Sequence, residues 1–384
     1  MNEKILILTG NFGDGHLQAA NAVSKFLTNR NPNAEVTIID FMELAHPLIH
    51  SISRYFFIQS LKRFPSIYGF IYNKTRESNN LSLMLKKTNK LGMGRLFKLL
   101  QDEQPTVVVS TFPLASGAMS AIKSVGLTNV PTMTVITDHT DHSYWLYPHT
   151  DKYFVGSEVV KEGLVRSGIS PDRIEVTGIP VRQEFNQTYD RSALIRKHGL
   201  DPNKPVVLIM GGGCGMFGGE LLKKLDELEH MTQSVQLLIV CGSNEKMRQQ
   251  LLEATRMSKH DYRILGYIDY VHEVMAVADL MITKPGGLTI SEAMAMQLPM
   301  LLYKPLPGQE EDNARFLLDS GVAYKVDSVE ELVFTLNYTL ANQLRLSMMR
   351  AKLAEMHELT INADVADLVF NAPVVQRFEE RYVM

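Results

Sequence analysis

A strand-like run near the start of the chain, Lys4 to Thr9, ends in a glycine-rich turn of sequence Gly10-Asn-Phe-Gly13-Asp-Gly15-His16. A helix is expected directly after it, over Gln18 to Thr28. A strand, a turn of small residues and a helix restrict the chain to an α/β fold, and the free backbone N–H groups of such a turn can bind an anion. The spacing G-x-x-G-x-G differs from the dinucleotide pattern G-x-G-x-x-G, which argues against a nicotinamide or flavin site.

His16 stands at the predicted start of this helix. The positive end of the helix dipole disfavours an imidazolium there, so we expect a neutral ring that can accept a proton. The alternative is a tight strand-to-helix turn with an incidental histidine.

Short runs of branched residues alternate with helix-like segments along the whole chain, which predicts parallel sheets covered by helices on both faces. A polar break near residue 185 separates two such series, and 384 residues exceed what one core usually supports. We therefore predict two consecutive domains, 1–184 and 185–359. The predicted strands are Ile5–Leu8, Val36–Ile39, Val107–Ser110, Thr132–Ile136, Lys152–Val155, Ile174–Val176, Val206–Met210, Gln236–Cys241, Arg263–Leu265, Leu280–Thr283, Met300–Tyr303 and Tyr324–Val326.

Composition excludes several protein classes. With 45% apolar and 21% charged residues, the chain is typical of a globular protein. Cys214 and Cys241 offer neither a disulfide framework nor zinc-site spacing. We recognise no signal peptide and no apolar run of about 18 residues that could span a membrane, so we expect a cytoplasmic protein.

The formal net charge of −3 hides a basic segment between Leu44 and Gln101, which holds ten Lys and Arg residues and one acidic residue, Glu77. Large apolar residues are interspersed with these charges, a composition typical of a helix in an anionic membrane interface. No nucleic-acid motif accompanies the charge, and we expect no nucleic-acid partner. An ordinary helical layer with a solvated basic face is the alternative. The residues expected to face the membrane are Phe56, Phe57, Lys62 and Arg63.

The second domain opens in the same way as the first. Strand Val206–Met210 is followed by Gly211-Gly212-Gly213-Cys-Gly215-Met-Phe-Gly-Gly219, with six glycines in nine positions. Such a loop lets the backbone approach a bulky anion closely. Neither glycine loop fits the G-x-x-x-x-G-K-[ST] phosphate loop, which argues against nucleotide triphosphate hydrolysis.

Two further stretches of the second domain combine helix starts with polar residues. Gly286 and Gly287 precede a helix predicted to begin near Thr289, which is again an anion-binding arrangement. Glu292 could simply close a capping box with Thr289. Glu310, Glu311 and Asp312 fall in the first turn of another predicted helix, where the dipole favours acids. That explanation does not account for Gln309.

Several motifs together carry a resemblance that spans most of the chain in order. They are Thr9–His16, Thr137-Asp138, Thr177-Gly-Ile-Pro180, Thr283–Glu292 and Pro307-Gly-Gln-Glu310. In these the chain resembles the processive diacylglycerol glucosyltransferases of Gram-positive bacteria and the plant monogalactosyldiacylglycerol synthases. It is more distantly similar to the N-acetylglucosaminyltransferase of the peptidoglycan lipid intermediate.

The resemblance implies the GT-B fold of glycosyltransferase family 28, with two Rossmann-like parallel-sheet domains facing across a cleft. The amino-terminal domain, joined by residues 360–384, would take the lipid acceptor, and residues 185–359 the UDP-sugar. By position, the backbone at Tyr267 and Ile268 would hold uracil, and Glu292 the ribose. Gly211 to Gly215 and Gly286-Gly287 would face the diphosphate, while Gln309 and Glu310 would contact the sugar. The remaining residues assigned to donor binding are Gly13, Gly15, Arg182, Thr289 and Asn313.

The resemblance also implies an inverting transfer from UDP-glucose to diacylglycerol or glycosyldiacylglycerol at the cytoplasmic face of the membrane, with the enzyme bound peripherally. Oriented N–H groups can stabilise the leaving UDP, and no Asp-x-Asp motif lies near the donor loops, so we expect neither a metal nor another cofactor. His16 is the candidate general base, with Asp138 orienting its ring.

The segment after Asp138 departs from the familiar bacterial pattern, because it reads His139-Thr-Asp-His142. These histidines could bind a metal or line the acceptor site together with Trp145. We favour the second reading, because no ligand is spaced to complete a metal site. Transfer of N-acetylglucosamine to a polyprenyl-linked lipid, epimerisation of a UDP-sugar, and non-catalytic sensing of a nucleotide sugar remain alternatives. The sequence leaves open the choice among glucose, galactose and N-acetylglucosamine, the number of sugars added, and the oligomeric state.

Overall fold

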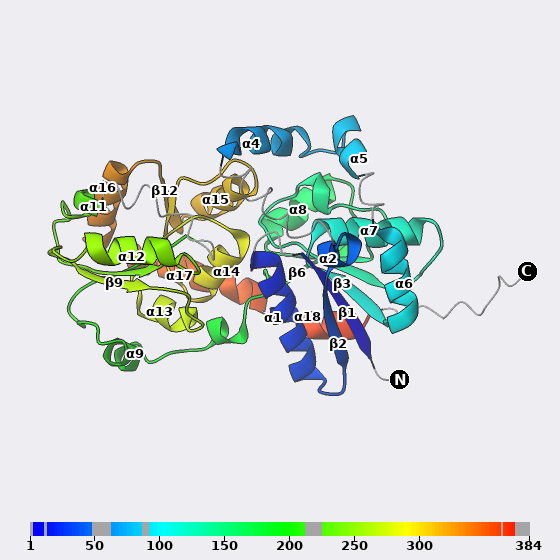
Figure 1. Ribbon diagram of the computed structural model, residues 1–384, viewed down its shortest axis with the longest axis horizontal. Coiled ribbons are helices and arrows are strands. Elements are labelled where there is room, and N and C mark those ends of the chain that lie inside the picture. The colour runs from blue at the N-terminus through cyan, green and yellow to red at the C-terminus, as the bar shows by residue number, and fades with distance from the viewer. Residues whose placement is uncertain are drawn as a thin grey trace, which may run out of the picture. The chain divides into compact units, whose positions relative to one another are not determined.

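The computed structural model describes residues 3–10, 14–47, 63–86, 92–211, 225–361 and 364–372. The chain forms two compact units (Figure 1). Unit 1 comprises Met1–Pro180 and Thr360–Met384, and unit 2 comprises Val181–Leu359.

Unit 1 is built on a six-stranded parallel sheet of order β2-β1-β3-β4-β5-β6. Along β1, Ile5 and Ile7 pack into one core layer while Leu6 and Leu8 pack into the other, as the two-residue period of a strand requires. Both faces of the sheet are therefore apolar, and both need helices to cover them. The strands are β1 (Lys4–Thr9), β2 (Glu35–Asp40), β3 (Val107–Ser110), β4 (Thr132–Val135), β5 (Lys152–Val155) and β6 (Ile174–Val176).

Helices cover the two faces of this sheet. On one face lie α1 (Asp14–Arg30) and α18 (Val365–Phe370), which run side by side although they come from opposite ends of the chain (Figure 1). An ion pair of 2.7 Å between Arg30 Nε and Asp367 Oδ1 joins them. The other face carries α2 (Phe41–Ala45), α6 (Met93–Glu103) and α7 (Pro113–Ser124). The unit also contains α4 (Pro65–Lys74), α5 (Asn80–Lys86) and α8 (Glu158–Arg166).

Unit 2 contains a second six-stranded parallel sheet, of order β12-β11-β10-β7-β8-β9. If β7 to β12 are numbered 1 to 6 in chain order, the sheet read from β9 to β12 has the order 3-2-1-4-5-6. This is the strand order of dinucleotide-binding domains. The strands are β7 (Val206–Met210), β8 (Gln236–Val240), β9 (Asp261–Leu265), β10 (Leu280–Thr283), β11 (Met300–Tyr303) and β12 (Ala323–Val326). The helices are α9 (Arg191–Lys197), α11 (Leu225–Leu228), α12 (Glu245–Ala254), α13 (Val271–Val277), α14 (Gly287–Ala295), α15 (Gln309–Asp319), α16 (Val329–Leu340) and α17 (Gln343–Ile361).

The predicted α/β class with two parallel sheets is confirmed, and each of the twelve predicted strands is present to within two residues at either end. Helix α8 begins after Ser157, whose hydroxyl accepts the Val160 N–H at the start of the helix. Helix α1 begins at Asp14, four residues before the predicted start. Among the described residues, we find no helix with the length and apolar character needed to span a membrane.

Candidate active site

Each sheet reverses its strand order at one point, and ligands of parallel α/β sheets bind outside the carboxyl ends of the strands at such points. In unit 1 the reversal lies between β1 and β3, and in unit 2 between β7 and β10. The glycine loop with His16 follows β1, and Gly286-Gly287 follows β10. Two of the predicted site motifs therefore stand at the switch points.

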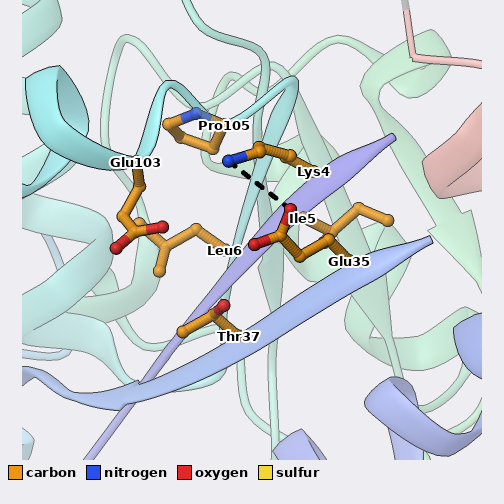
Figure 2. Close-up of a pocket in the computed structure, with 7 residues that line it drawn as sticks. All are labelled: Lys4, Ile5, Leu6, Glu35, Thr37, Glu103 and Pro105. Atoms are coloured by element: carbon orange, nitrogen blue, oxygen red, sulfur yellow. Dashed lines mark ion pairs between the residues drawn. The ribbon is translucent and has the colours of Figure 1, made fainter. Parts of the chain in front are cut away.

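A shallow hollow on unit 1 lies elsewhere (Figure 2). It is found at the amino ends of β1 and β2, where Lys4 and Glu35 form an ion pair of 3.4 Å. The hollow is therefore at the opposite end of the strands from His16, which follows the carboxyl end of β1, and we assign the hollow no part in the site. The residues that line it are Lys4, Ile5, Leu6, Glu35, Thr37, Glu103 and Pro105.

His16 lies in the first turn of α1, and both its backbone carbonyl group and its imidazole ring make polar contacts. Thr111 Oγ1 lies 3.0 Å from the His16 carbonyl oxygen and 3.0 Å from Thr9 Oγ1, so one hydroxyl joins the ends of β1 and β3 to the helix. The imidazole Nδ1 lies 3.0 Å from Thr137 Oγ1. The ring packs edge-on to Phe112, with centroids 5.2 Å apart.

Burial lowers the pKa of His16 to about 4, partly opposed by a hydrogen bond with the backbone of Thr111. Loss of water disfavours the charged imidazolium, whereas a backbone acceptor favours it. The ring is therefore neutral at pH 7, as the sequence predicted. The larger cause is burial, whereas the prediction relied on the helix dipole.

The hydrogen-bond partner of His16 Nδ1 is the side chain of Thr137, the residue before the predicted partner Asp138. The orienting role of Asp138 stays a prediction. Thr137 and Thr111 are the residues that sequence reasoning missed. Thr137 belongs to the Thr137-Asp138 motif, so the signal was present, but the motif does not say which of its two side chains faces the histidine.

In unit 2 a threonine also joins the two strands at the switch point. Thr283 Oγ1, at the end of β10, donates to the carbonyl oxygen of Met210 at the end of β7, at 2.7 Å. The fully buried Asn313 donates from Nδ2 to the carbonyl oxygen of Pro285, at 2.9 Å, and so fixes the turn before α14. The buried Gly211 follows β7 directly.

Helix α14 begins at Gly287, with Gly286 as its N-cap, and Glu292 is its sixth residue. The capping-box interpretation of Thr289 and Glu292 is therefore wrong, because the helix starts two residues earlier than predicted and Glu292 lies beyond the first turn. Burial raises the pKa of Glu292 to about 7, and the positive charge of Arg182 opposes this rise. A half-buried carboxyl group without a capping role is a candidate ligand residue.

Arg182, whose charge acts on this carboxyl group, contacts the loop between β9 and α13. Its Nη1 donates to the carbonyl oxygen of Asp269, at 3.2 Å, and its guanidinium lies 5.2 Å from the centre of the Phe185 ring. Asp269 follows Tyr267 and Ile268 in that loop. The Tyr267 side chain is 75% exposed, whereas Ile268 packs partly buried against the core.

The acidic residues at the start of α15 lie in its first turn, as predicted. Glu311 Oε2 accepts the N–H of Gly308, at 3.3 Å, in a capping arrangement. Glu310 behaves differently, because its Oε2 accepts the Leu306 N–H at 2.7 Å and burial raises its pKa. Gln309 is the first residue of the helix.

The residues predicted for the acceptor side have different environments. Arg63 is exposed, whereas His142 and Trp145 are buried. Burial lowers the pKa of His139 to about 3, and its Nδ1 lies 3.4 Å from Ser157 Oγ. Among the described residues, no group of three His, Cys, Asp or Glu side chains could hold a metal ion. The predicted residues Gly13, Phe56, Phe57, Lys62, Gly212, Gly213 and Gly215 lie outside the described residues.

Comparisons with known proteins place the chain in a family. Residues 16–181 match the model described as "Monogalactosyldiacylglycerol (MGDG) synthase", and residues 206–369 match the glycosyltransferase family 28 C-terminal domain. The processive diacylglycerol beta-glucosyltransferase of Bacillus licheniformis is 34% identical over 93% of this chain and 91% of its own length. The protein of the same name from Staphylococcus carnosus is 35% identical over 86% of this chain and 83% of its own length.

The chain belongs to the family of the processive diacylglycerol glucosyltransferases. Solved structures agree with this family's GT-B fold. MurG of Acinetobacter baumannii superimposes with a TM-score of 0.62 at 17% identity, covering 96% of this chain and 99% of that one. Alr3699/HepE of Anabaena, solved in complex with UDP, gives a TM-score of 0.55 at 15% identity, covering 96% and 99%.

Proposed function

We propose that this family member transfers glucose from UDP-glucose to diacylglycerol with inversion, and that it can add further glucose units to the glycosyldiacylglycerol formed. The names of the similar proteins support the substrate class. The observation that carries the proposal is the neutral His16 at the unit 1 switch point, its Nδ1 occupied by Thr137.

In the proposed reaction His16 is the general base. In the neutral ring Nδ1 carries the hydrogen and donates a hydrogen bond to Thr137 Oγ1. The lone pair of Nε2 is then available to the hydroxyl of the acceptor lipid. Nε2 takes the proton of the diacylglycerol hydroxyl while the hydroxyl oxygen bonds to the anomeric carbon. The bond from that carbon to UDP breaks on the opposite face, and UDP leaves with the electron pair. An α-linked donor thus gives a β-glycoside.

The donor side of the proposal rests on unit 2. The N–H groups at the start of α14, including that of Gly287, would stabilise the charge that develops on the diphosphate, so the proposal requires no metal ion. Ionised Glu292 would accept hydrogen bonds from the two ribose hydroxyls. Gln309 and Glu310, at the start of α15, would contact the sugar.

We further propose peripheral binding to an anionic membrane through α4, at the cytoplasmic face. The exposed side chains include Phe64 at the N-cap of α4 and Ile67 and Phe70 within it, and the three-residue spacing of these three puts them on one side of the helix. The exposed Arg63 and Lys74 lie before and at the end of α4. An apolar row with flanking basic residues is suited to anionic lipid.

The deciding experiment mixes the purified protein with UDP-glucose and diacylglycerol in mixed micelles and measures released UDP and glycolipid. We expect one UDP for each glucose transferred, with β-glucosyldiacylglycerol as the first product, and UDP-galactose and UDP-N-acetylglucosamine serve as competing donors that identify the preferred sugar. Binding of UDP-glucose without any UDP release would contradict the proposal and favour a sensor. Faster transfer of N-acetylglucosamine to a polyprenyl-linked acceptor would also contradict it.

A further inference from the structure

The segment Thr137–Trp145, which follows β4, contacts His16 at both of its ends. Thr137 Oγ1 lies 3.0 Å from His16 Nδ1. At the other end, the Trp145 ring lies 6.0 Å from the His16 ring between centroids. The path of this segment therefore decides the surroundings of the histidine.

The middle of the segment is attached to the carboxyl-terminal end of α4. The Tyr72 hydroxyl lies 2.9 Å from Thr140 Oγ1, and His142 Nε2 lies 2.9 Å from the Tyr72 carbonyl oxygen. The rings of Tyr72 and His142 also pack on each other, with centroids 4.1 Å apart. One tyrosine thus holds the segment by its ring, its hydroxyl and its backbone.

Neighbouring residues strengthen this attachment. Arg76 Nη1 pairs with Asp141 Oδ1 at 2.6 Å, and the Ser143 N–H donates to the Arg76 carbonyl oxygen at 2.9 Å. The Ser143 hydroxyl donates to the carbonyl oxygen of Thr75, at 2.7 Å. Polar contacts that are buried or partly buried favour one relative placement, because other placements leave donors or acceptors without partners.

His142 uses both of its ring nitrogens inside this network. Its Nδ1 accepts the Tyr144 N–H, at 3.1 Å, and caps the short 3-10 helix Ser143–Trp145. Nε2 must then carry the proton, which it donates to the Tyr72 carbonyl oxygen. The ring is 3% exposed. Metal binding and direct contact with the acceptor would each require one of these bonds to break.

We infer that Tyr72 and His142 are positioning residues, which hold the Thr137–Trp145 segment against α4 and thereby orient the His16 ring toward the acceptor. The inference rests on the proposed role of His16 as the base. It gives a function to the second histidine of His139-Thr-Asp-His142, which the reaction itself does not use.

The test uses His142→Asn in the full-length protein. The asparagine oxygen can still accept the Tyr144 N–H, so the cap survives while the bond to Tyr72 and the ring contact are lost. We expect kcat to fall on the order of tenfold or more, because small misplacement of a reacting group is costly. KM for UDP-glucose should not change, since Glu292, Gln309 and Glu310, which are proposed to contact the donor, belong to unit 2. His149→Asn, at an exposed histidine four residues beyond Trp145, is the matched control.

A second readout does not depend on turnover. Trp145 is the single tryptophan of the chain and is buried, so its fluorescence reports on this segment. His142→Asn should shift the Trp145 emission to the red well below the melting temperature, whereas His149→Asn should not. Tyr72→Phe, which removes one hydroxyl and keeps the ring, should reproduce a smaller kcat loss if His142→Asn fails to fold.

Wild-type kcat and emission in both His142→Asn and Tyr72→Phe would overturn the inference. So would a lower melting temperature with unchanged kcat per folded molecule and unchanged emission, because that is the result of a merely structural role. Failure of the proposed function looks different: the wild type would not transfer glucose, or His16→Ala would stay active. The emission of His142→Asn would still test the attachment in that case.

Discussion

The two switch points are built alike, and they differ in the titratable group that each one holds. In both units a threonine hydroxyl ties adjacent strand ends together, Thr111 in unit 1 and Thr283 in unit 2. Burial acts on a histidine in the first and on a glutamate in the second. It lowers the pKa of His16 to about 4 and raises that of Glu292 to about 7.

One physical cause thus has opposite consequences for function. Burial favours the neutral form of either group. For His16 the neutral form is the proton acceptor that the proposed base requires. For Glu292 the neutral form is the weaker hydrogen-bond acceptor, and the charge of Arg182 offsets the effect only in part. Unit 1 should therefore be insensitive to pH near neutrality, and unit 2 should be sensitive.

Removal of the base should have the largest effect. His16→Ala should lower kcat by about 10²–10⁴-fold, because the acceptor hydroxyl then lacks a proton acceptor. Calorimetric affinity for UDP-glucose should stay within about twofold, since Glu292, Gln309 and Glu310, which are proposed to contact the donor, lie in unit 2. If the variant retained more than about a third of wild-type activity, His16 would not be the base.

Glu292→Gln should have the opposite effect to His16→Ala, because it should lower the affinity for UDP-glucose. Hydrogen bonds to a charged group contribute about 1.5–3 kcal/mol, so the loss should be on the order of 10–100-fold. The melting temperature should change little, because α14 begins at Gly287 and Glu292 does not cap it. A large loss of stability with unchanged affinity would contradict the ribose assignment.

The pH dependence of KM and kcat in the wild-type protein should distinguish the contributions of the two units. The raised pKa of Glu292 means that its carboxylate is lost as pH falls through about 7, so KM for UDP-glucose should rise about tenfold from pH 8 to pH 6. The lowered pKa of His16 means that the base form persists down to about pH 4, so kcat should be flat over the same range.

The control for that titration is Glu292→Gln, in which KM should become independent of pH between 6 and 8. UDP-glucose is the ligand to use, because the terminal phosphate of free UDP titrates near pH 6 and would obscure the result. If kcat fell between pH 8 and pH 6 while KM stayed constant, the comparison between the two units would be incorrect.

The two units should also differ in how much their exposed apolar side chains contribute to vesicle binding. Ile67→Ser with Phe70→Ser on α4 should weaken binding to anionic vesicles roughly five- to tenfold, because less apolar surface enters the interface. The matched control is Phe334→Ser in unit 2, which is similarly exposed but lies on α16 near Glu330 and Glu331. Equal loss in both variants, measured by vesicle sedimentation, would contradict docking through α4.

The smallest effects should come from removing the hydroxyl groups of Thr111 and Thr283, which join neighbouring strand ends. Thr111→Val and Thr283→Val should each cost about 1 kcal/mol of unfolding free energy, the usual net contribution of a hydrogen bond. Thr111→Val should also lower kcat about two- to fivefold, because its hydroxyl holds the backbone of His16. Thr283→Val should affect KM for UDP-glucose instead. Identical kinetic changes in both would remove the distinction between the switch points.

Much of the site could be recognised from local sequence, and the errors have physical causes. The glycine turn with His16 and the start of α15 were predictable because backbone conformation and helix starts depend on neighbouring residues. The start of α14 was placed two residues late, because Thr289 is a good cap by residue type while the turn through Pro285 and Gly286 begins the helix earlier. That shift removed the capping explanation for Glu292.

The sequence by itself determined the two parallel sheets, the glycine loops after β1 and β10, and the family, since each strand, loop and family motif is a pattern of residues close together along the chain. The tertiary structure decided which side chains meet. Thr137 reaches His16 because β4 lies two strands from β1 in the sheet, an order that local patterns do not encode. It also decided the charges of His16 and Glu292, because a pKa depends on the water that packing removes, and packing is a property of the whole fold.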